Sequence, residues 1–138
     1  MAQAGKCCLS CVLLIVVACL LSCKETTCRL NEVGAQSSLR LIRKAESTYR
    51  SQDSQHRFGT LLDLHATGLI EAELASGTKD GYRYQVNVGN DSFTAIATPL
   101  EYDVTGSWSF YVDESGVIRG SVTRGKLPDV NDRPVRYQ

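Results

Sequence analysis

The clearest pattern along the chain is a stripe of recurring positions between residues 31 and 50. Mostly apolar or small side chains return there every three or four positions, at Ala35, Ser38, Leu39, Ile42, Ala45, Glu46 and Tyr49. This spacing places the set on one face of an α-helix. We therefore predict an amphipathic helix over 31–50. Asn31 is a candidate N-cap, and an earlier start near Lys24 is the alternative.

Two shorter helical pieces follow this stripe. Residues 60–64 come directly after a glycine, and Thr60 is a suitable N-cap for them. Residues 69–75 form the second piece, which Ser76-Gly77 closes in the manner of a helix C-terminus.

The pattern then changes to strict alternation, which is typical of strands with one buried face. We predict strands over 82–88, 92–98, 108–112 and 117–119, joined as hairpins into a sheet of four antiparallel strands in sequence order. The alternation turns five aromatic residues toward the core: Tyr82, Tyr84, Phe93, Trp108 and Phe110. Ile96 and Tyr111 fall on the opposite face, where we expect them to cover a second surface.

A helix followed only by hairpins predicts an α+β domain, in which the apolar stripe of the helix packs across the sheet. Residues 123–138 carry two prolines and scattered charges, so we expect a flexible polar tail. The predicted organisation is an export signal or membrane anchor over 1–22, an α+β domain over 23–122 and the tail over 123–138.

The N-terminus has the three parts of a secretory signal. Lys6 supplies the positive charge, and residues 11–21 form an unbroken apolar run. A transmembrane helix needs about 20 apolar residues, so this shorter run favours a cleaved signal. A retained short anchor and a buried core helix are the alternatives.

All six cysteines precede residue 29, and Leu20-Leu21-Ser22-Cys23 resembles the lipobox of bacterial lipoproteins. That resemblance implies a lipid attached to the Cys23 thiol and cleavage just before it. Cys19 is a poorer second candidate, and small hydrophobic side chains of an apolar helix are the plainer interpretation. Cys28 would then remain as a free thiol or pair between chains.

The net charge of the chain and its few candidate catalytic or metal-binding residues narrow the range of possible functions. Lys plus Arg and Asp plus Glu both number 15, so no net charge attracts nucleic acid. The two histidines, His56 and His65, lack metal-ligand spacing. A triad of either histidine with Asp53 or Asp63 and a nearby serine, Ser51 or Ser54, is possible only on paper. We predict no catalytic residues, no metal and no cofactor.

Several separated motifs occur in a fixed order between residues 31 and 120. They are Asn31-Glu32, Ser38-Leu39-Arg40, Ala45-Glu46, Thr48-Tyr49, Gly68-Leu69-Ile70, the stretch 74–82, and Asp113-Glu114-Ser115-Gly116-Val117-Ile118-Arg119. In this order they resemble the globular head of bacterial type IV pilin-like proteins. The resemblance implies a helix laid across a four-stranded antiparallel sheet.

The N-terminus departs from that family. Type IV prepilins have a Gly-Phe cleavage site and a glutamate early in a long apolar helix, whereas no acid precedes Glu25 here. The leading hypothesis is therefore a non-enzymatic, exported, lipid-anchored pilin-like protein of the bacterial cell envelope. Its partners would be the membrane and other envelope or pilin proteins. The alternative is a type IV pilus or type II secretion pseudopilus subunit that retains its N-terminal helix.

Overall fold

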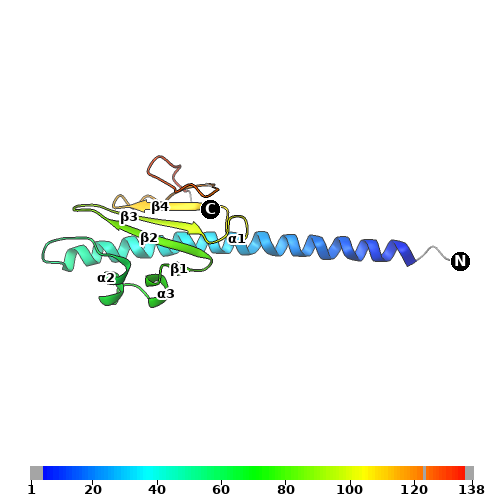
Figure 1. The fold of residues 1–138 in the computed structure, drawn as a ribbon, viewed down its shortest axis with the longest axis horizontal. Helices are drawn as coiled ribbons and strands as arrows, with labels where there is room; N and C mark the ends of the chain where they lie inside the picture. The colour runs from blue at the N-terminus through cyan, green and yellow to red at the C-terminus, as the bar shows by residue number, and fades with distance from the viewer. Residues whose placement is uncertain (1–4, 123, 136–138) are drawn as a thin grey trace.

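The computed structural model describes residues 5–122 and 124–135, with side chains described from residue 24 onward. One long helix lies along an antiparallel sheet, and its N-terminal part extends beyond the sheet (Figure 1). In chain order the elements are α1 (Gly5–Gln52), α2 (Leu61–Ala66), α3 (Ala72–Ala75), β1 (Thr78–Lys79), β2 (Tyr82–Val88), β3 (Phe93–Pro99), β4 (Ser109–Asp113) and β5 (Arg119–Ser121).

The α+β class is confirmed, but the sheet has five strands rather than four. Its order is β1-β2-β3-β4-β5, and each strand pairs antiparallel with the next. The additional strand, β1, is two residues long, so it is too short to alternate visibly. It reaches β2 through a two-residue turn in which Asp80 and Gly81 both have positive φ, at 49° and 74°. Turns of this type match the twist of a hairpin.

Helix α1 packs its stripe against β3 and β4, as the spacing predicts. Ala35, Leu39 and Ile42 are completely buried there. The predicted boundary at Asn31 is wrong, because α1 continues through that position from Gly5. Nothing in the sequence around residue 31 breaks a helix, and the Asn31 side chain binds another part of the chain instead of capping.

Helix α2 lies close to its predicted position, whereas α3 begins only at Ala72, so Leu69 and Ile70 of the predicted 69–75 piece precede the helix. Thr60 is the N-cap of α2 and forms a capping box with Asp63, in which each side chain accepts a hydrogen bond from the other's backbone N–H. Ser76 is the C-cap of α3, and Gly77 follows it with φ at 82°.

Four of the five aromatic residues expected in the core are there: Tyr82, Tyr84, Phe93 and Phe110. Trp108 is the exception, because it precedes β4 and leaves 40% of its side chain exposed. The alternation begins only where the strand begins, at Ser109, and the backbone before that residue belongs to a loop.

The opposite face of the sheet is also covered. Ile96 and Tyr111 are paired across β3 and β4 on this face, and each of them is only 9% exposed. The segment after β5 explains their burial, because Leu127 borders the same hollow as Thr98 and Ser109, which lie on that face. Figure 1 shows this segment lying over β4 on the side away from α1.

The described part of the C-terminal segment also pairs with β5. The Val135 N–H donates to the Ile118 carbonyl at 2.9 Å, and the Gly120 N–H donates to the Arg133 carbonyl at 3.0 Å. Val135 packs against the core. These contacts give residues 124–135 a defined course over the sheet, while the predicted flexibility of the tail stays a prediction.

One carboxyl group lies inside the core. Glu46 on α1 is completely buried, and its Oε2 accepts a hydrogen bond from the Gly59 N–H at 2.9 Å. Its Oε1 has no hydrogen-bond partner among the described residues. Burial raises the pKa of Glu46 to about 7, the Gly59 N–H opposes this rise, and the charge of Asp63 adds to it. Glu46 thus connects α1 to the segment before α2.

The raised pKa of Glu46 predicts that the protein loses stability as the pH rises. The folded chain holds this proton more tightly than the unfolded chain, whose Glu pKa is 4.5. The contribution is therefore complete below pH 4.5 and is lost as the pH passes through about 7. The corresponding loss in the free energy of unfolding is about 3 kcal/mol. Urea unfolding between pH 5 and 8 should show this fall, and it should flatten in Glu46→Gln.

Glu101→Gln is the matched control for this experiment, because Glu101 is an exposed glutamate far from the core. Its unfolding free energy should keep the wild-type dependence on pH. Equal slopes for Glu46→Gln and the wild type would show that Glu46 does not carry the effect.

Candidate interaction surface

Loop 100–108 is bound to the outer part of α1, at the point where the helix leaves the sheet. The Cys28 thiol donates a hydrogen bond to the Val104 carbonyl at 3.1 Å. One turn further along the helix, Asn31 Nδ2 donates to the Thr105 carbonyl at 2.9 Å. Cys28 is half-buried and forms no disulfide. The thiol that the sequence leaves without a role therefore holds a loop in this structure.

Glu32 makes the charged contact between α1 and loop 100–108, and we call this set of contacts the joint. Its Oε1 accepts hydrogen bonds from the backbone N–H groups of Ser107, at 2.9 Å, and Trp108, at 3.3 Å. A carboxylate that accepts two backbone N–H groups binds them more strongly than a neutral acceptor would. Glu32 therefore satisfies the backbone of the loop just before β4 begins.

Tyr82 fixes the same loop from the sheet side. It is completely buried, and its hydroxyl donates to the Trp108 carbonyl at 2.8 Å. Burial raises the pKa of Tyr82 far above its usual value, and the charge of Glu32 raises it further. Gly106 packs on this ring so closely that an added Cβ would collide with the Tyr82 hydroxyl. The backbone at Trp108 is thus held from both sides, by Glu32 and by Tyr82.

Trp108 borders two hollows of about 400 Å³ each. Charged groups dominate the first, which is lined by Lys24, Glu25, Cys28, Arg29, Glu32, Asp103, Ser107 and Trp108. The second is more apolar and is lined by Glu32, Gln36, Trp108, Phe110, Gly120, Arg133, Pro134 and Val135. The partly exposed Trp108 therefore borders both a charged hollow and a more apolar one.

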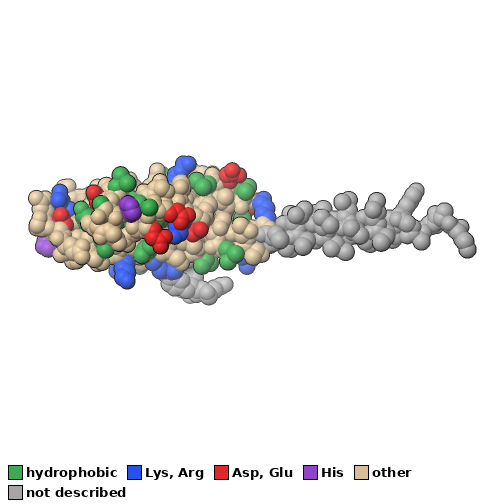
Figure 2. Space-filling view, turned by 90° about the horizontal axis from the view of Figure 1, so that it is seen from below, with side chains coloured by type: hydrophobic (Ala, Val, Ile, Leu, Met, Phe, Trp, Pro, Cys, Tyr) green, Lys and Arg blue, Asp and Glu red, His purple; other side chains and the backbone are tan. Residues whose placement is uncertain are grey.

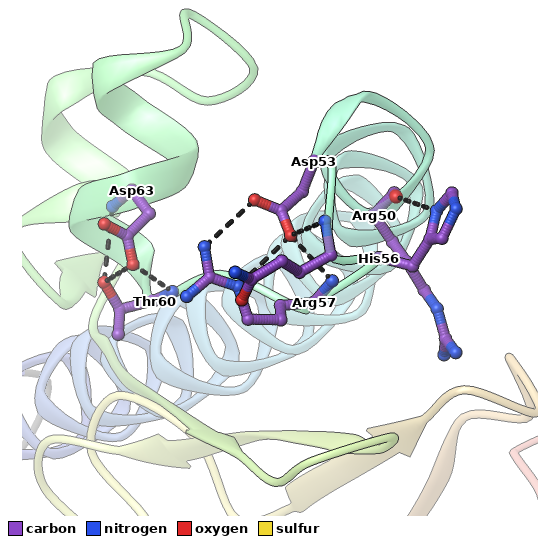
Figure 3. A network of polar contacts seen from close by, with 7 residues as sticks. Arg50, Asp53, His56, Arg57, Thr60 and Asp63 are labelled. Atoms are coloured by element: carbon purple, nitrogen blue, oxygen red, sulfur yellow. Dashed lines mark hydrogen bonds and ion pairs between the residues drawn. The ribbon is translucent and has the colours of Figure 1, made fainter.

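Three of the candidate catalytic residues, Asp53, His56 and Asp63, follow the C-terminal end of α1 and make local contacts (Figure 3). Asp53 bonds to Arg57 at 3.2 Å, and these bonds lower the pKa of Asp53 to about 2. Asp63 bonds to Thr60, which lowers its pKa. The His56 ring lies 3.2 Å from the Arg50 carbonyl. This arrangement brings no serine, histidine and carboxylate together.

Two further candidate catalytic residues, His65 and Ser51, also contact backbone carbonyls. The His65 ring lies 3.0 Å from the Ile70 carbonyl, and the Ser51 hydroxyl donates to the Thr48 carbonyl at 2.7 Å. Among the residues with described side chains, no group of three or more His, Cys, Asp or Glu could hold a metal ion. Acidic and basic side chains are interspersed over the face of the head seen in Figure 2.

The predicted lipidation site cannot be placed in the same way. Cys23 and the apolar run at 11–21 lie outside the residues whose side chains the structure describes. Across the part that is described, no helix combines the length and the apolar character needed to cross a membrane. The predictions of an export signal and of lipid at Cys23 stay predictions.

Comparison with protein families, with curated proteins and with solved structures found no match to this chain. The resemblance of residues 31–120 to a pilin-like head therefore stays a prediction. Function has to be argued from the residues and contacts of the chain itself.

The joint between α1 and loop 100–108 gives a testable stability effect. Glu32→Ala leaves two backbone N–H groups without their acceptor, which should cost about 1–3 kcal/mol in the free energy of unfolding. Hydrogen exchange at the Ser107 and Trp108 amides should accelerate as well. Urea unfolding and exchange measured by NMR would check both effects.

Glu25→Ala removes a carboxylate from the same helix and the same hollow, but Glu25 is exposed. It should leave both measurements at the wild-type values. Unchanged exchange at Ser107 in Glu32→Ala would contradict the role given to Glu32.

Proposed function

We propose that this chain is a non-enzymatic, pilin-like structural or interaction protein, exported and anchored by lipid at Cys23 to the bacterial cell envelope. The observation that carries the proposal is the continuity of α1 from position 23 to Gln52. Its C-terminal half packs on the sheet, so the head is joined without a linker to the segment that would carry the anchor. A long helix laid across an antiparallel sheet is also the arrangement that the pilin resemblance implies.

The surface of the head supports an interaction role over a catalytic one. Both histidine rings lie against backbone carbonyls, and Asp53 and Asp63 are committed to Arg57 and Thr60. An exposed indole borders the hollow at the outer part of α1, and it offers a large contact area and little chemistry.

The lipid anchor is tested by metabolic labelling with a tagged fatty acid in a bacterial host. The wild-type protein should incorporate the label, because the Cys23 thiol is the predicted site of the thioether. Cys23→Ala should remove the label completely. Labelling that survives in Cys23→Ala would exclude Cys23 as the site.

Cys19→Ala is the matched control, since it removes a thiol from the same apolar segment one helical turn away. Labelling of this variant should equal that of the wild type. Loss of label in Cys19→Ala but not in Cys23→Ala would move the attachment to the second candidate.

A filament or pseudopilus subunit is the second candidate function, and one observation favours it. Leu30 and Val33 are 67% and 60% exposed, and Leu41 is 39% exposed. Their spacing puts them along one side of α1, away from the stripe that packs on the sheet. An exposed apolar line on a long helix suits packing against the helix of another subunit.

Mass spectrometry of the mature N-terminus separates the two functions. A lipoprotein should begin at Cys23 with acyl mass added, because cleavage precedes the modified cysteine. A subunit that keeps its apolar helix should begin upstream of Val12. A mature start at Cys23 would exclude the filament subunit, and a start upstream of Val12 would exclude the lipoprotein.

A further inference from the structure

Exposed apolar side chains surround α1 at the level where it leaves the head. We call this surface the base: residues 24–33 of α1 together with loop 100–108. Its exposed apolar members are Leu30, Val33, Leu100, Tyr102, Val104 and Trp108, each between 40% and 67% exposed. They include an indole and a phenol, the two side chains that gather at the boundary between membrane and water.

The loop of the base is held in place while its side chains stay in solvent. Cys28, Asn31 and Glu32 bind its backbone from the helix, and Tyr82 binds it from the sheet. The loop therefore presents Val104 and Trp108 at fixed positions, so little conformational freedom is left to lose when they bind a surface.

The position of the base along α1 fits the thickness of a lipid headgroup layer. An α-helix rises 1.5 Å per residue, so Cys28 lies roughly 7.5 Å along the axis from position 23. The headgroup region of one leaflet is about 5–8 Å thick. If lipid at position 23 marks the edge of the hydrocarbon, the loop bound at Cys28 lies at the outer limit of the headgroups.

The charges of the base do not favour an anionic surface. Lys24 and Arg29 are matched there by exposed carboxylates at Glu25, Glu101 and Asp103. A polybasic segment would attract anionic lipid by about 1 kcal/mol for each cation, and this surface has no such excess. Attraction to lipid would have to come from the aromatic and apolar side chains.

We infer that the head rests on the bilayer that holds its N-terminal segment, with Trp108 and Val104 inserted into the headgroup layer. This inference rests on the membrane anchor of the proposed function and names the partner of the base as a lipid surface bound without a net charge attraction. Leu30 and Val33 lie further along α1 from position 23 than this layer is thick, so they take no part in the contact.

Trp108 provides the probe, because it is the only tryptophan of the chain. The full-length protein, processed by the cell, is reconstituted into phosphatidylcholine vesicles and isolated by flotation. Its emission should shift to the blue relative to the protein in detergent-free buffer, and lipids brominated near the headgroup should quench it. Iodide in the water should quench it less than in the vesicle-free protein.

Two variants test whether the loop makes the contact. Val104→Asp should reduce the blue shift and the quenching by brominated lipid, because a carboxylate then enters the headgroup layer. Leu62→Asp is the matched control: Leu62 is 70% exposed on α2, at the end of the head away from the base (Figure 1). Its emission in vesicles should equal that of the wild type. Both substitutions are on exposed side chains, and circular dichroism would verify the fold.

The outcomes are distinguishable. Protein that fails to float with the vesicles would overturn the membrane anchor and the docking of the head together. Protein that floats while Trp108 keeps its aqueous emission would overturn the docking alone. A blue shift that requires phosphatidylglycerol in the vesicles would replace apolar docking by electrostatic attraction and so overturn the inference as stated. An equal shift with and without phosphatidylglycerol supports it.

Discussion

The close approach of α1 to the middle of the sheet determines the rest of this structure. Ala35 and Ala45 on the helix and Ala95 and Ala97 on β3 are buried, and none of them extends beyond a methyl group. Small side chains on both surfaces let a helix lie near a sheet, and larger neighbours then fill the space beside them. With the helix fixed across β3 and β4, residues 28–32 of α1 hold loop 100–108 and its C-terminal end leads into α2.

Elements with a periodic hydrophobic pattern could be predicted from the sequence, whereas elements without such a pattern could not. Two periodic patterns indicate which side chains are buried: the stripe from Ala35 to Tyr49 and the alternation from Tyr82 onward. They predict the α+β class, the strand order and four of the core aromatic residues. Strand β1 has two residues and therefore no period. The predicted strand starts one residue too early, at Trp108, and so assigns this residue to the core, although β4 begins at Ser109.

The two-sided burial of the sheet and the joint at loop 100–108 could not be predicted, because both depend on contacts between distant parts of the chain. Burial of Ile96 depends on a polar segment more than 25 positions later, whose composition resembles that of a disordered tail. Glu32 binds a backbone 75 positions away. In the sequence, Asn31 looks like the start of a helix, and only the structure shows that the side chains of Asn31 and Glu32 bind the loop.

The segment over 133–135 has a further consequence for copies of this protein that meet one another. By pairing with β5 it occupies the backbone groups at one outer edge of the sheet. On the other side, β1 pairs with only Tyr82 and Arg83 of β2, and residues 85–88 of β2 have no neighbouring strand there among the described strands. Lys79 on β1 lies near the carboxylates of Glu71 and Glu73. An unpaired strand edge is a template for intermolecular strand addition and aggregation, and short, charged or covered edges suppress it. The covered edge at β5 and the short, charged strand β1 therefore oppose strand addition by another copy at these two positions.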